Sequence, residues 1–349
     1  MTAESVDTFR ARAAAWLTQN RQHAPRDYGA ICPPNLIEEA KKWQRLIFES
    51  GFAGLHWPTE HGGQGLSPAH HGAWVEECAK VGVPPVLNMV GLVLAGGAVM
   101  TYGTDELKQQ HLRSTLNADE VWCQLFSEPG AGSDLGSLST RADRDGDRFI
   151  INGQKVWCSG GRCSNWGILM ARTDFEAKKH EGISFFLIPM DLPGIEVRPL
   201  KQMTGESEFD EVFFTDVRIP HANVVGDVND GWRLAKVTLG NERVSLSTGG
   251  VLWGSGPTAL EMLDAVRLRG TITDPVMRQR LAVIYTEHVL LDLIRMRTLS
   301  ARLRGEQPGA EASIRKILAD EHGQNVMEVA RDLLGAQAML RGVAESSES

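Results

Sequence analysis

Apolar and polar residues follow one pattern at both ends of the chain and a different one in the middle. Up to about Glu120, apolar residues recur every three or four positions, which predicts helices. These helices are expected at residues 9–20, 34–50, 68–80 and 105–115. Ser67 followed by Pro68 is typical of an N-cap and a first helical residue. Residues 1–120 are therefore predicted to form an N-terminal helical domain.

Between Val121 and about Val225, the apolar residues form short runs separated by turn residues. Asn152-Gly153, between two apolar runs, has the pattern of a hairpin turn, and RDGD at residues 144–147 predicts another turn. Four further apolar runs follow at regular spacing: WGILMAR, GISFFLIPM, GIEVRPL and DEVFFTDVRI. Short strands of this kind predict a small antiparallel β-barrel or sandwich domain over residues 121–226.

From Asn229 onward the helical pattern returns. A long helix opens after Asp230-Gly231, a second begins at residues 273–275 and extends to about Leu303, and a third covers about 310–340. Long amphipathic helices joined by short turns pack as an antiparallel bundle. Residues 227–349 are therefore predicted to form a third domain, and the fold class is α+β, with a β-domain between two helical domains.

Composition and charge exclude several classes of function. The net charge is −8 and no basic run occurs, which argues against nucleic-acid binding. The five cysteines form no CxxC pair and no signal-peptide pattern precedes them, so a reducing, cytoplasmic location is expected. Residues 81–104 carry no charge, but Pro84, Pro85 and Asn88 interrupt them. This predicts a short buried helix at about 86–101 rather than a membrane span.

The histidines offer no metal site. No carboxylate or further histidine stands at ligand spacing from His61, and the adjacent His70 and His71 would point about 100° apart on a helix of ~3.6 residues per turn. We expect all three to be solvated surface residues, and no metal is predicted.

The stretch LFSEPGAGSDLG, residues 125–136, places three glycines almost as in a dinucleotide fingerprint. A Rossmann turn needs a strand before the glycines and a helix directly after them. VWCQLF supplies the strand, but strand and turn residues follow Gly136, and the third glycine comes one position late. Ser133 also lacks the GxSxG frame of a nucleophile elbow. The stretch is either an ordinary turn or a β-domain loop whose amides and hydroxyls hold a flat, polar-edged ligand.

Several segments, taken together, closely resemble the acyl-CoA dehydrogenase family. LFSEPGAGSD, GDRFIINGQKVWCSGG and NWGILMARTD resemble its middle domain. GLHWPTEHGGQGLSP is similar to a loop of its N-terminal helical domain, and YGTDELKQQHL is similar to the entry to its middle domain. GWRLAKVTLGNERVSL is similar to the start of its C-terminal bundle. The resemblance implies FAD-dependent oxidation of an acyl-CoA thioester to the trans-2-enoyl-CoA, in fatty acid and lipid degradation. Electrons would pass to an electron-transferring flavoprotein.

The resemblance also implies where the cofactor binds. The matching positions are Phe126, Ser127, Gly132, Ser133, Trp157 and Ser159. The first two would flank the flavin ring through backbone and hydroxyl groups. The next two would line the turn near the flavin phosphates and the CoA arm, and the last two would cover the other side of the ring. Amides and hydroxyls can stabilise the negative charge of reduced flavin, and an aromatic wall keeps water out.

The reaction needs a base for the proton alpha to the thioester, and a carboxylate in a dry pocket can serve. In the family this Glu lies either in a G-G/T-S-E segment near the C-terminus or early in the first long C-terminal helix, just before an Arg. The chain ends in AMLRGVAESSES without the first segment, and Glu242-Arg243 in GNERVSL matches the second. The resemblance implies that Glu242 is the base and that Arg243 and Ser133 contact substrate. A solvated helix carboxylate is the plain alternative for Glu242.

Two family segments depart from the expected pattern. In place of R-x-x-F-G, which contacts FAD across a dimer interface, the chain has RLRGTITDPVMRQRLA, where Arg267 or Arg269 could substitute. For Q-I-x-G-G-x-G it has only RDLLGAQAM, with Gly335 the nearest match. The family's final helix is missing from the sequence, as in a trimmed chain, a degenerate member, or a subunit completed by another chain.

A homo- or hetero-oligomer, a dimer of dimers, is therefore expected. The main interpretation is a self-sufficient acyl-CoA dehydrogenase. The alternative is a non-catalytic or partner-completed subunit of a heteromeric one, and an oxidase on the same fold is a third interpretation. The acyl group is left open by the sequence.

Overall fold

The computed structural model describes residues 4–26, 32–203, 205–246, 258–270, 272–304 and 311–340. By its internal contacts the chain divides into two compact units, Met1–Leu239 and Gly240–Ser349. The first unit therefore contains both the predicted N-terminal helical domain and the predicted β-domain.

The N-terminal region is helical, and its helices lie where apolar periodicity predicts them. They are α1 (Val6–Asn20), α2 (Ile37–Glu49), α3 (Pro68–Val81), α4 (Gly96–Tyr102) and α5 (Asp105–Leu116). The uncharged stretch forms a π-helical turn, Val90–Ala95, followed by α4, so the expected buried helix begins later than predicted. Within the described ranges, no helix is long and apolar enough to cross a membrane.

The start of α3 differs from the prediction in its side-chain contacts. Pro68 is the first helical residue as expected, but the Ser67 hydroxyl makes no capping bond to the helix backbone. It lies 2.8 Å from Nδ1 of His70, and Nε2 of that ring lies 3.0 Å from the Glu4 carbonyl. His70 is 5% exposed, so the expectation of a solvated histidine is wrong there. Its two ring nitrogens are satisfied by chain atoms, which makes burial possible.

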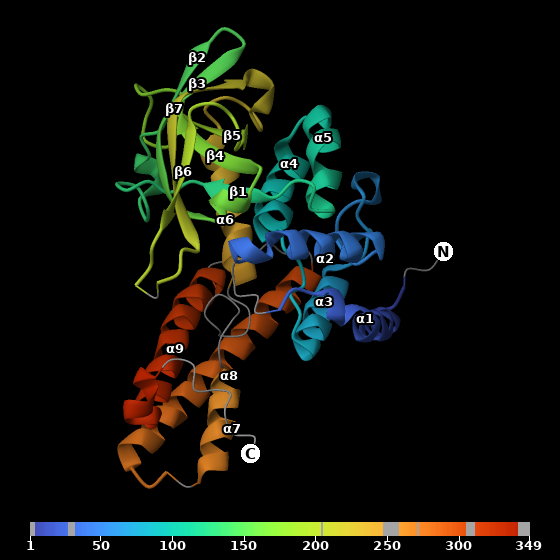
Figure 1. Cartoon of the computed structure of the whole chain (residues 1–349), viewed down its shortest axis with the longest axis vertical. Coiled ribbons are helices and arrows are strands. Elements are labelled where there is room, and N and C mark those ends of the chain that lie inside the picture. Colours follow the sequence, from blue (N-terminus) through green and yellow to red (C-terminus); the bar gives the residue numbers. More distant parts are fainter. Residues whose placement is uncertain are drawn as a thin grey trace. The chain divides into compact units, whose positions relative to one another are not determined.

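The middle region is a strongly curved sheet, shown beside helices α1–α5 in Figure 1. Its strands are β1 (Trp122–Leu125), β2 (Arg141–Asp145), β3 (Arg148–Ser159), β4 (Trp166–Arg172), β5 (Ile183–Pro189), β6 (Ile195–Leu200) and β7 (Phe209–Pro220). The strand order is β1-β4-β2-β3-β7-β6, and β5 pairs with β4. Most pairs are antiparallel as predicted, but β4 pairs parallel with β1 and with β2.

One predicted hairpin turn is wrong. The RDGD turn joins β2 to β3 with Gly146 at φ 63°, as expected. Asn152-Gly153, in contrast, lies inside β3, where the pairing with β7 shifts register between Ile151 and Gly153. A Cβ at Gly153 would lie 2.6 Å from the Thr140 hydroxyl oxygen, so glycine here permits a close approach of a neighbouring segment. The Asn-Gly pair thus marks a β-bulge rather than a turn.

Two hydrophobic cores hold the first unit together. One core lies inside the curved sheet and includes Phe149, Phe186 and Ile219. The other is continuous from the N-terminal helices to the opposite sheet face, since Trp43 belongs to the same cluster as the sheet residue Phe185. The helical and β regions therefore share one interior.

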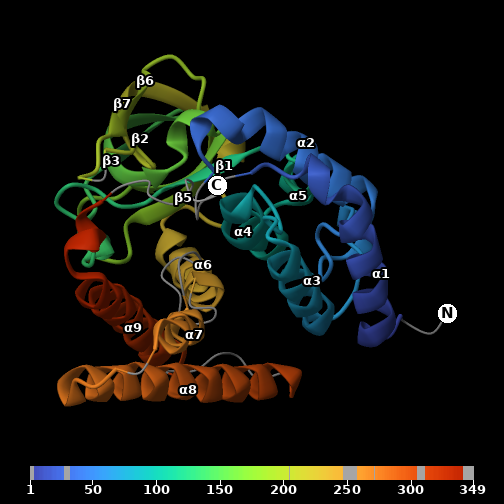
Figure 2. The ribbon, with the colours of Figure 1, turned by 60° about the horizontal axis from the view of Figure 1, so that its bottom comes forward.

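Helices make up the rest of the described chain. α6 (Gly231–Leu246) begins in the first unit, and the later helices are α7 (Ala259–Arg269), α8 (Pro275–Leu303) and α9 (Glu311–Leu334). A small core, including Met262, Ile284 and Val326, joins α7, α8 and α9. Figure 2 shows α7 and α9 on the same side of the long α8. The predicted start and end of α8 are confirmed.

Candidate active site

The loop after β1 begins with a buried side chain and continues with accessible backbone. Phe126 is 3% exposed and packs edge-on against Phe185, with ring centroids 5.7 Å apart. Its side chain belongs to the core, so only its backbone is available to a ligand. Ser127 is half-buried, and its carbonyl accepts a hydrogen bond from the Val156 amide at 2.9 Å. Within the described residues, neither the amide nor the hydroxyl of Ser127 bonds to another residue.

A buried ion pair fixes both ends of this loop. Lys155 Nζ, on β3, lies 2.8 Å from Glu128 Oε1, and the two side chains are 0% and 5% exposed. Lys155 Nζ also donates to the Phe126 carbonyl at 2.9 Å. Glu128 accepts from the amides of Ser139 and Thr140 at 2.7 and 2.9 Å. Burial works to raise the pKa of Glu128, but the Lys155 charge and these hydrogen bonds lower it to about 2.

In the middle of the loop, Gly130 and Gly132 leave the backbone uncovered by side chains. Glu128 and Ala131 exchange two backbone hydrogen bonds of 3.1 and 3.0 Å, which form a tight turn. A Cβ added at Gly130 or Gly132 would meet nothing within 4 Å, and neither glycine has a positive φ. Neither packing nor conformation requires glycine here, so the bare backbone suits the close approach of a ligand. Ser133, the next predicted site residue, is exposed on the same turn.

Two cationic side chains hold the far end of the loop, the buried Arg172 and the exposed Lys179. The buried Arg172 guanidinium donates to the carbonyls of Gly136 and Leu138 at 2.8 and 3.1 Å. On the surface, Lys179 Nζ pairs with Asp134 Oδ2 at 2.5 Å, with side chains 47% and 60% exposed. The loop is thus anchored at its beginning, at its turn and at its end.

Trp157 is presented outward by a bulge in β3. The pairing of β3 with β7 shifts register between Lys155 and Cys158, and Trp157 within the bulge has a φ of 60°. This conformation is rare for a bulky residue and costs about 1–3 kcal/mol, so the surrounding structure imposes it. The indole is 60% exposed and touches Phe209 edge-on, with ring centroids 5.9 Å apart. Ser159 ends the same strand and is half-buried.

Trp157→Gly is expected to separate ligand binding from stability. Glycine accepts the positive φ and the lost ring is mostly exposed, so the free energy of unfolding should change by less than about 1 kcal/mol. If the indole covers the flavin, as the resemblance to acyl-CoA dehydrogenases implies, its loss should weaken FAD binding by about tenfold or more. Urea denaturation and flavin fluorescence measure the two effects. Phe175→Ala, which removes another half-exposed ring, is the control, and equal FAD affinity in both variants would exclude Trp157 from the site.

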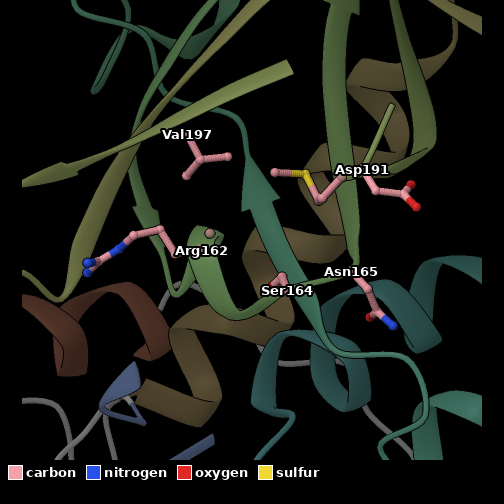
Figure 3. Close-up of a pocket in the computed structure, with 7 residues that line it drawn as sticks. Arg162, Ser164, Asn165, Asp191 and Val197 are labelled. Carbon is pink, nitrogen blue, oxygen red and sulfur yellow. The ribbon is translucent and has the colours of Figure 1, made fainter. Parts of the chain in front are cut away.

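A shallow pocket of about 330 Å³ lies beyond the end of β3. It is lined by Gly161, Arg162, Ser164, Asn165, Met190, Asp191 and Val197. Figure 3 shows Arg162 and Val197 on one side and Asn165 and Asp191 on the other. Arg162 Nε pairs with the buried Asp210 at 2.6 Å, and burial raises the pKa of Asp210 while Arg162 opposes this rise. The ion pair anchors the segment after β3.

The predicted base lies in α6. Glu242 and Arg243 fall within the bounds of this helix, and their side chains lie outside the described part of the chain. The boundary between the two compact units also falls at Gly240. The roles of Glu242 and Arg243 therefore stay predictions.

The positions suggested for contact with FAD across an interface have ordinary local roles. Arg267, on α7, pairs with Asp264 at 2.9 Å on the helix surface. Arg269 is the last residue of α7 and is exposed. Gly335 has a φ of 55° directly after α9, as is common where a helix ends. Each of the three is accounted for by its place in or beside a helix.

Sequence reasoning missed the Lys155–Glu128 pair. A signal was present, because Lys155 lies among the strand residues just before Trp157 and Glu128 stands in the glycine loop. A lysine at an inward strand position requires a buried partner. Only the structure identifies Glu128 as the partner, because the sequence contains many other acidic residues that could pair with Lys155. Within the described residues, no group of three or more potential metal ligands is found.

The chain matches three family descriptions in order. They are "Acyl-CoA dehydrogenase, N-terminal domain" over residues 5–119, the middle domain over 123–217 and the C-terminal domain over 229–347. Acyl-CoA dehydrogenase IpdE1 of Mycobacterium tuberculosis (strain ATCC 25618 / H37Rv) is 37% identical to it over 353 residues, covering 99% of this chain and 90% of that protein.

Solved structures show the same fold. One described as "Tcur3481-Tcur3483 steroid ACAD" superposes with a TM-score of 0.82 at 30% identity, covering 98% of this chain and 88% of that one. The ChsE4-ChsE5 complex from Mycobacterium tuberculosis superposes with a TM-score of 0.77 at 28% identity, with coverage of 98% and 88%. The expected order of helical, β and helical regions is confirmed by these matches.

Proposed function

This chain belongs to the acyl-CoA dehydrogenase family, and we propose that it is one subunit of a heteromeric acyl-CoA dehydrogenase that holds FAD with the loop of residues 126–139 and with β3. The observation that carries the proposal is the anchored loop beside Trp157. Its turn has a bare backbone, the Ser127 amide and hydroxyl have no partner among the described residues, and an exposed indole lies next to Val156, which binds Ser127. These residues fit a flat ring with polar edges.

The chain's own residues would bind, orient and deprotonate the substrate. Glu242 takes the proton from the carbon alpha to the thioester, and Arg243 and Ser133 hold the substrate. FAD held at this loop would supply the acceptor for a hydride from the beta carbon and, afterwards, the two electrons for an electron-transferring flavoprotein. Trp157 and Ser159 exclude water from one side of the ring. The products are the trans-2-enoyl-CoA and the protonated carboxyl of Glu242.

Heteromeric assembly is favoured over a self-sufficient homomer by two observations. Two of the similar structures carry names that join two proteins, Tcur3481-Tcur3483 and ChsE4-ChsE5. In addition, α8 exposes large apolar side chains on the side away from its small core: Val276, Val283, Tyr285, Val289, Leu290, Leu293 and Met296. A group of large exposed apolar side chains on a helix whose opposite face is already buried is normally covered by another surface. We assign this exposed α8 stripe to the partner subunit.

A polycyclic acyl-CoA is the substrate class that we favour over a straight-chain fatty acyl-CoA. The support is the word "steroid" in the name of a structure 30% identical to this chain. The sequence after Glu242, SLSTGGVLWGSG, is also rich in small residues, which is compatible with a bulky acyl group. A reducing, cytoplasmic location is part of the same proposal.

Visible spectra of the chain purified alone and with its partner test this function. The partner to co-express is a second subunit of the acyl-CoA dehydrogenase family from the same organism. We expect the co-purified assembly to be yellow, and steroid acyl-CoA thioesters to bleach its flavin faster than straight-chain thioesters. A yellow, fully active chain without any partner would support the self-sufficient interpretation. An assembly that contains no FAD would reject the proposed function.

Charges placed in the exposed α8 stripe are expected to break the assembly. Burying each leucine contributes about 1.5 kcal/mol or more, so Leu290→Glu with Leu293→Glu should weaken association by at least about a hundredfold. Native mass spectrometry at several concentrations measures the change, and circular dichroism checks that the helices persist. Leu268→Glu, at a leucine 89% exposed on α7, is the matched control. Equal association of both variants would place the interface elsewhere.

A further inference from the structure

In the peptide unit between Phe126 and Ser127, the carbonyl is hydrogen-bonded, while the N–H has no hydrogen-bond partner among the described residues. Its carbonyl accepts a hydrogen bond from Lys155 Nζ at 2.9 Å, and the following carbonyl, of Ser127, accepts from the Val156 amide at 2.9 Å. The peptide bond is trans, so its N–H points away from its C=O and hence away from Lys155. No described residue accepts a hydrogen bond from this N–H.

The donor behind this peptide is a buried charge. Lys155 is 0% exposed, and among the described residues its ammonium has two hydrogen-bond partners, the Phe126 carbonyl and Glu128 Oε1. Hydrogen bonds from charged donors are stronger than neutral ones, and a low local dielectric strengthens them further. A charge on the carbonyl side draws electron density toward the oxygen. The N–H of the same peptide unit therefore becomes a better donor.

We propose that Lys155 is a positioning residue that acts through the Phe126–Ser127 peptide, so that the Ser127 N–H binds reduced FAD more tightly than oxidised FAD. The inference rests on the proposed function, because it requires FAD at this loop. Reduced flavin carries more negative charge than oxidised flavin, and a polarised donor favours the more negative form. Lys155 thereby raises the reduction potential of the cofactor and helps it to accept electrons from the substrate.

Two alternative roles for Lys155 predict different results. If the ion pair only keeps the loop in shape, its loss weakens binding of oxidised and reduced FAD equally, and the reduction potential does not move. If the ammonium acts by its long-range field, the effect should be small from the start, because the carboxylate 2.8 Å away cancels most of that field. Only the path through the peptide predicts a potential that depends on the hydrogen bond to the Phe126 carbonyl.

The test compares three variants of the assembled, FAD-containing protein. Lys155→Met removes the hydrogen bond and the charge, Lys155→Arg keeps a buried cation, and the double variant Lys155→Met with Glu128→Gln leaves no unpaired buried charge. The dissociation constant of oxidised FAD is measured by flavin fluorescence, and the midpoint potential by anaerobic titration with redox dyes. Both readouts are independent of turnover.

In Lys155→Met and in the double variant, we expect the ratio of the dissociation constants of oxidised and reduced FAD to fall about tenfold. For a two-electron couple, this fall corresponds to a midpoint potential about 30 mV lower. Lys155→Arg should recover part of this shift. If Lys155→Met does not fold, the double variant is compared with the wild type for the same two quantities, FAD affinity and midpoint potential. Weaker FAD binding with an unchanged midpoint in the double variant would overturn the inference and leave the proposed function standing. A wild-type assembly without FAD would overturn both.

Discussion

Glu242→Gln is expected to lower kcat of the assembled enzyme by about 10²–10⁴-fold while FAD stays bound. Glutamine keeps the size and the hydrogen-bonding reach of the side chain, but its amide cannot take up the alpha proton of the substrate. The loss should appear in the chemical step, which bleaching of the flavin absorbance by a saturating acyl-CoA reports in a single turnover. The flavin spectrum before mixing shows that the cofactor is still present.

The control for this prediction is another glutamate on a helix. Glu39→Gln changes an exposed carboxylate on α2 and should leave bleaching and turnover unchanged. If Glu242→Gln keeps near-full turnover on every accepted acyl-CoA, the base lies elsewhere, and a carboxylate of the partner subunit becomes the next candidate. The chain would then be the FAD-holding but non-catalytic member of the assembly.

Lys155→Met is expected to lower the free energy of unfolding by about 3–5 kcal/mol. The substitution leaves the Glu128 carboxylate buried without its counter-charge, and breaking a buried pair from one side has this cost. It also leaves the Phe126 carbonyl without its donor. Urea denaturation followed by tryptophan fluorescence measures the change. The double variant with Glu128→Gln should recover much of the loss, because no buried charge then remains.

An exposed ion pair on the same loop is the matched control. Lys179→Met breaks the pair with Asp134, whose side chains are 47% and 60% exposed, and should cost less than about 1 kcal/mol. Both variants remove one lysine that pairs with an acid of the same loop, so they differ mainly in the burial of the pair. Equal losses in the two variants would show that burial of the Lys155–Glu128 pair does not determine its contribution.

The helices were predicted well because the spacing of apolar residues by three or four positions is visible within each helix itself. The bounds of α8, residues 275–303, follow from a proline near the start and sustained apolar spacing. The Asn152-Gly153 turn failed because pairing partners are not local. β3 continues through these residues to pair with β7, which lies more than fifty residues later, and long-range pairing overrides the turn preference. The parallel pairs of β4 were missed for the same reason.

The candidate site was predicted as a set of positions but not as an arrangement. The resemblance identified Ser127 and Trp157, and the structure brings them together through the Val156 amide. The bulge that turns Trp157 outward could not be predicted from the sequence, since it depends on the register with β7. Lys155 and Glu128 stand 27 positions apart, and only the folded sheet makes them partners.

The continuous core that joins the N-terminal helices to the sheet limits how this chain can be recombined with its relatives. Family descriptions divide the chain near residue 120, yet Trp43 and Phe185 belong to one hydrophobic cluster across that division. A chimera with its crossover there would take the two parts of this hydrophobic cluster from different proteins. Their side chains have not been selected to pack against each other. A crossover near residue 240 would transfer the whole cluster intact. Residues 1–239 are therefore the natural block for exchange between homologues.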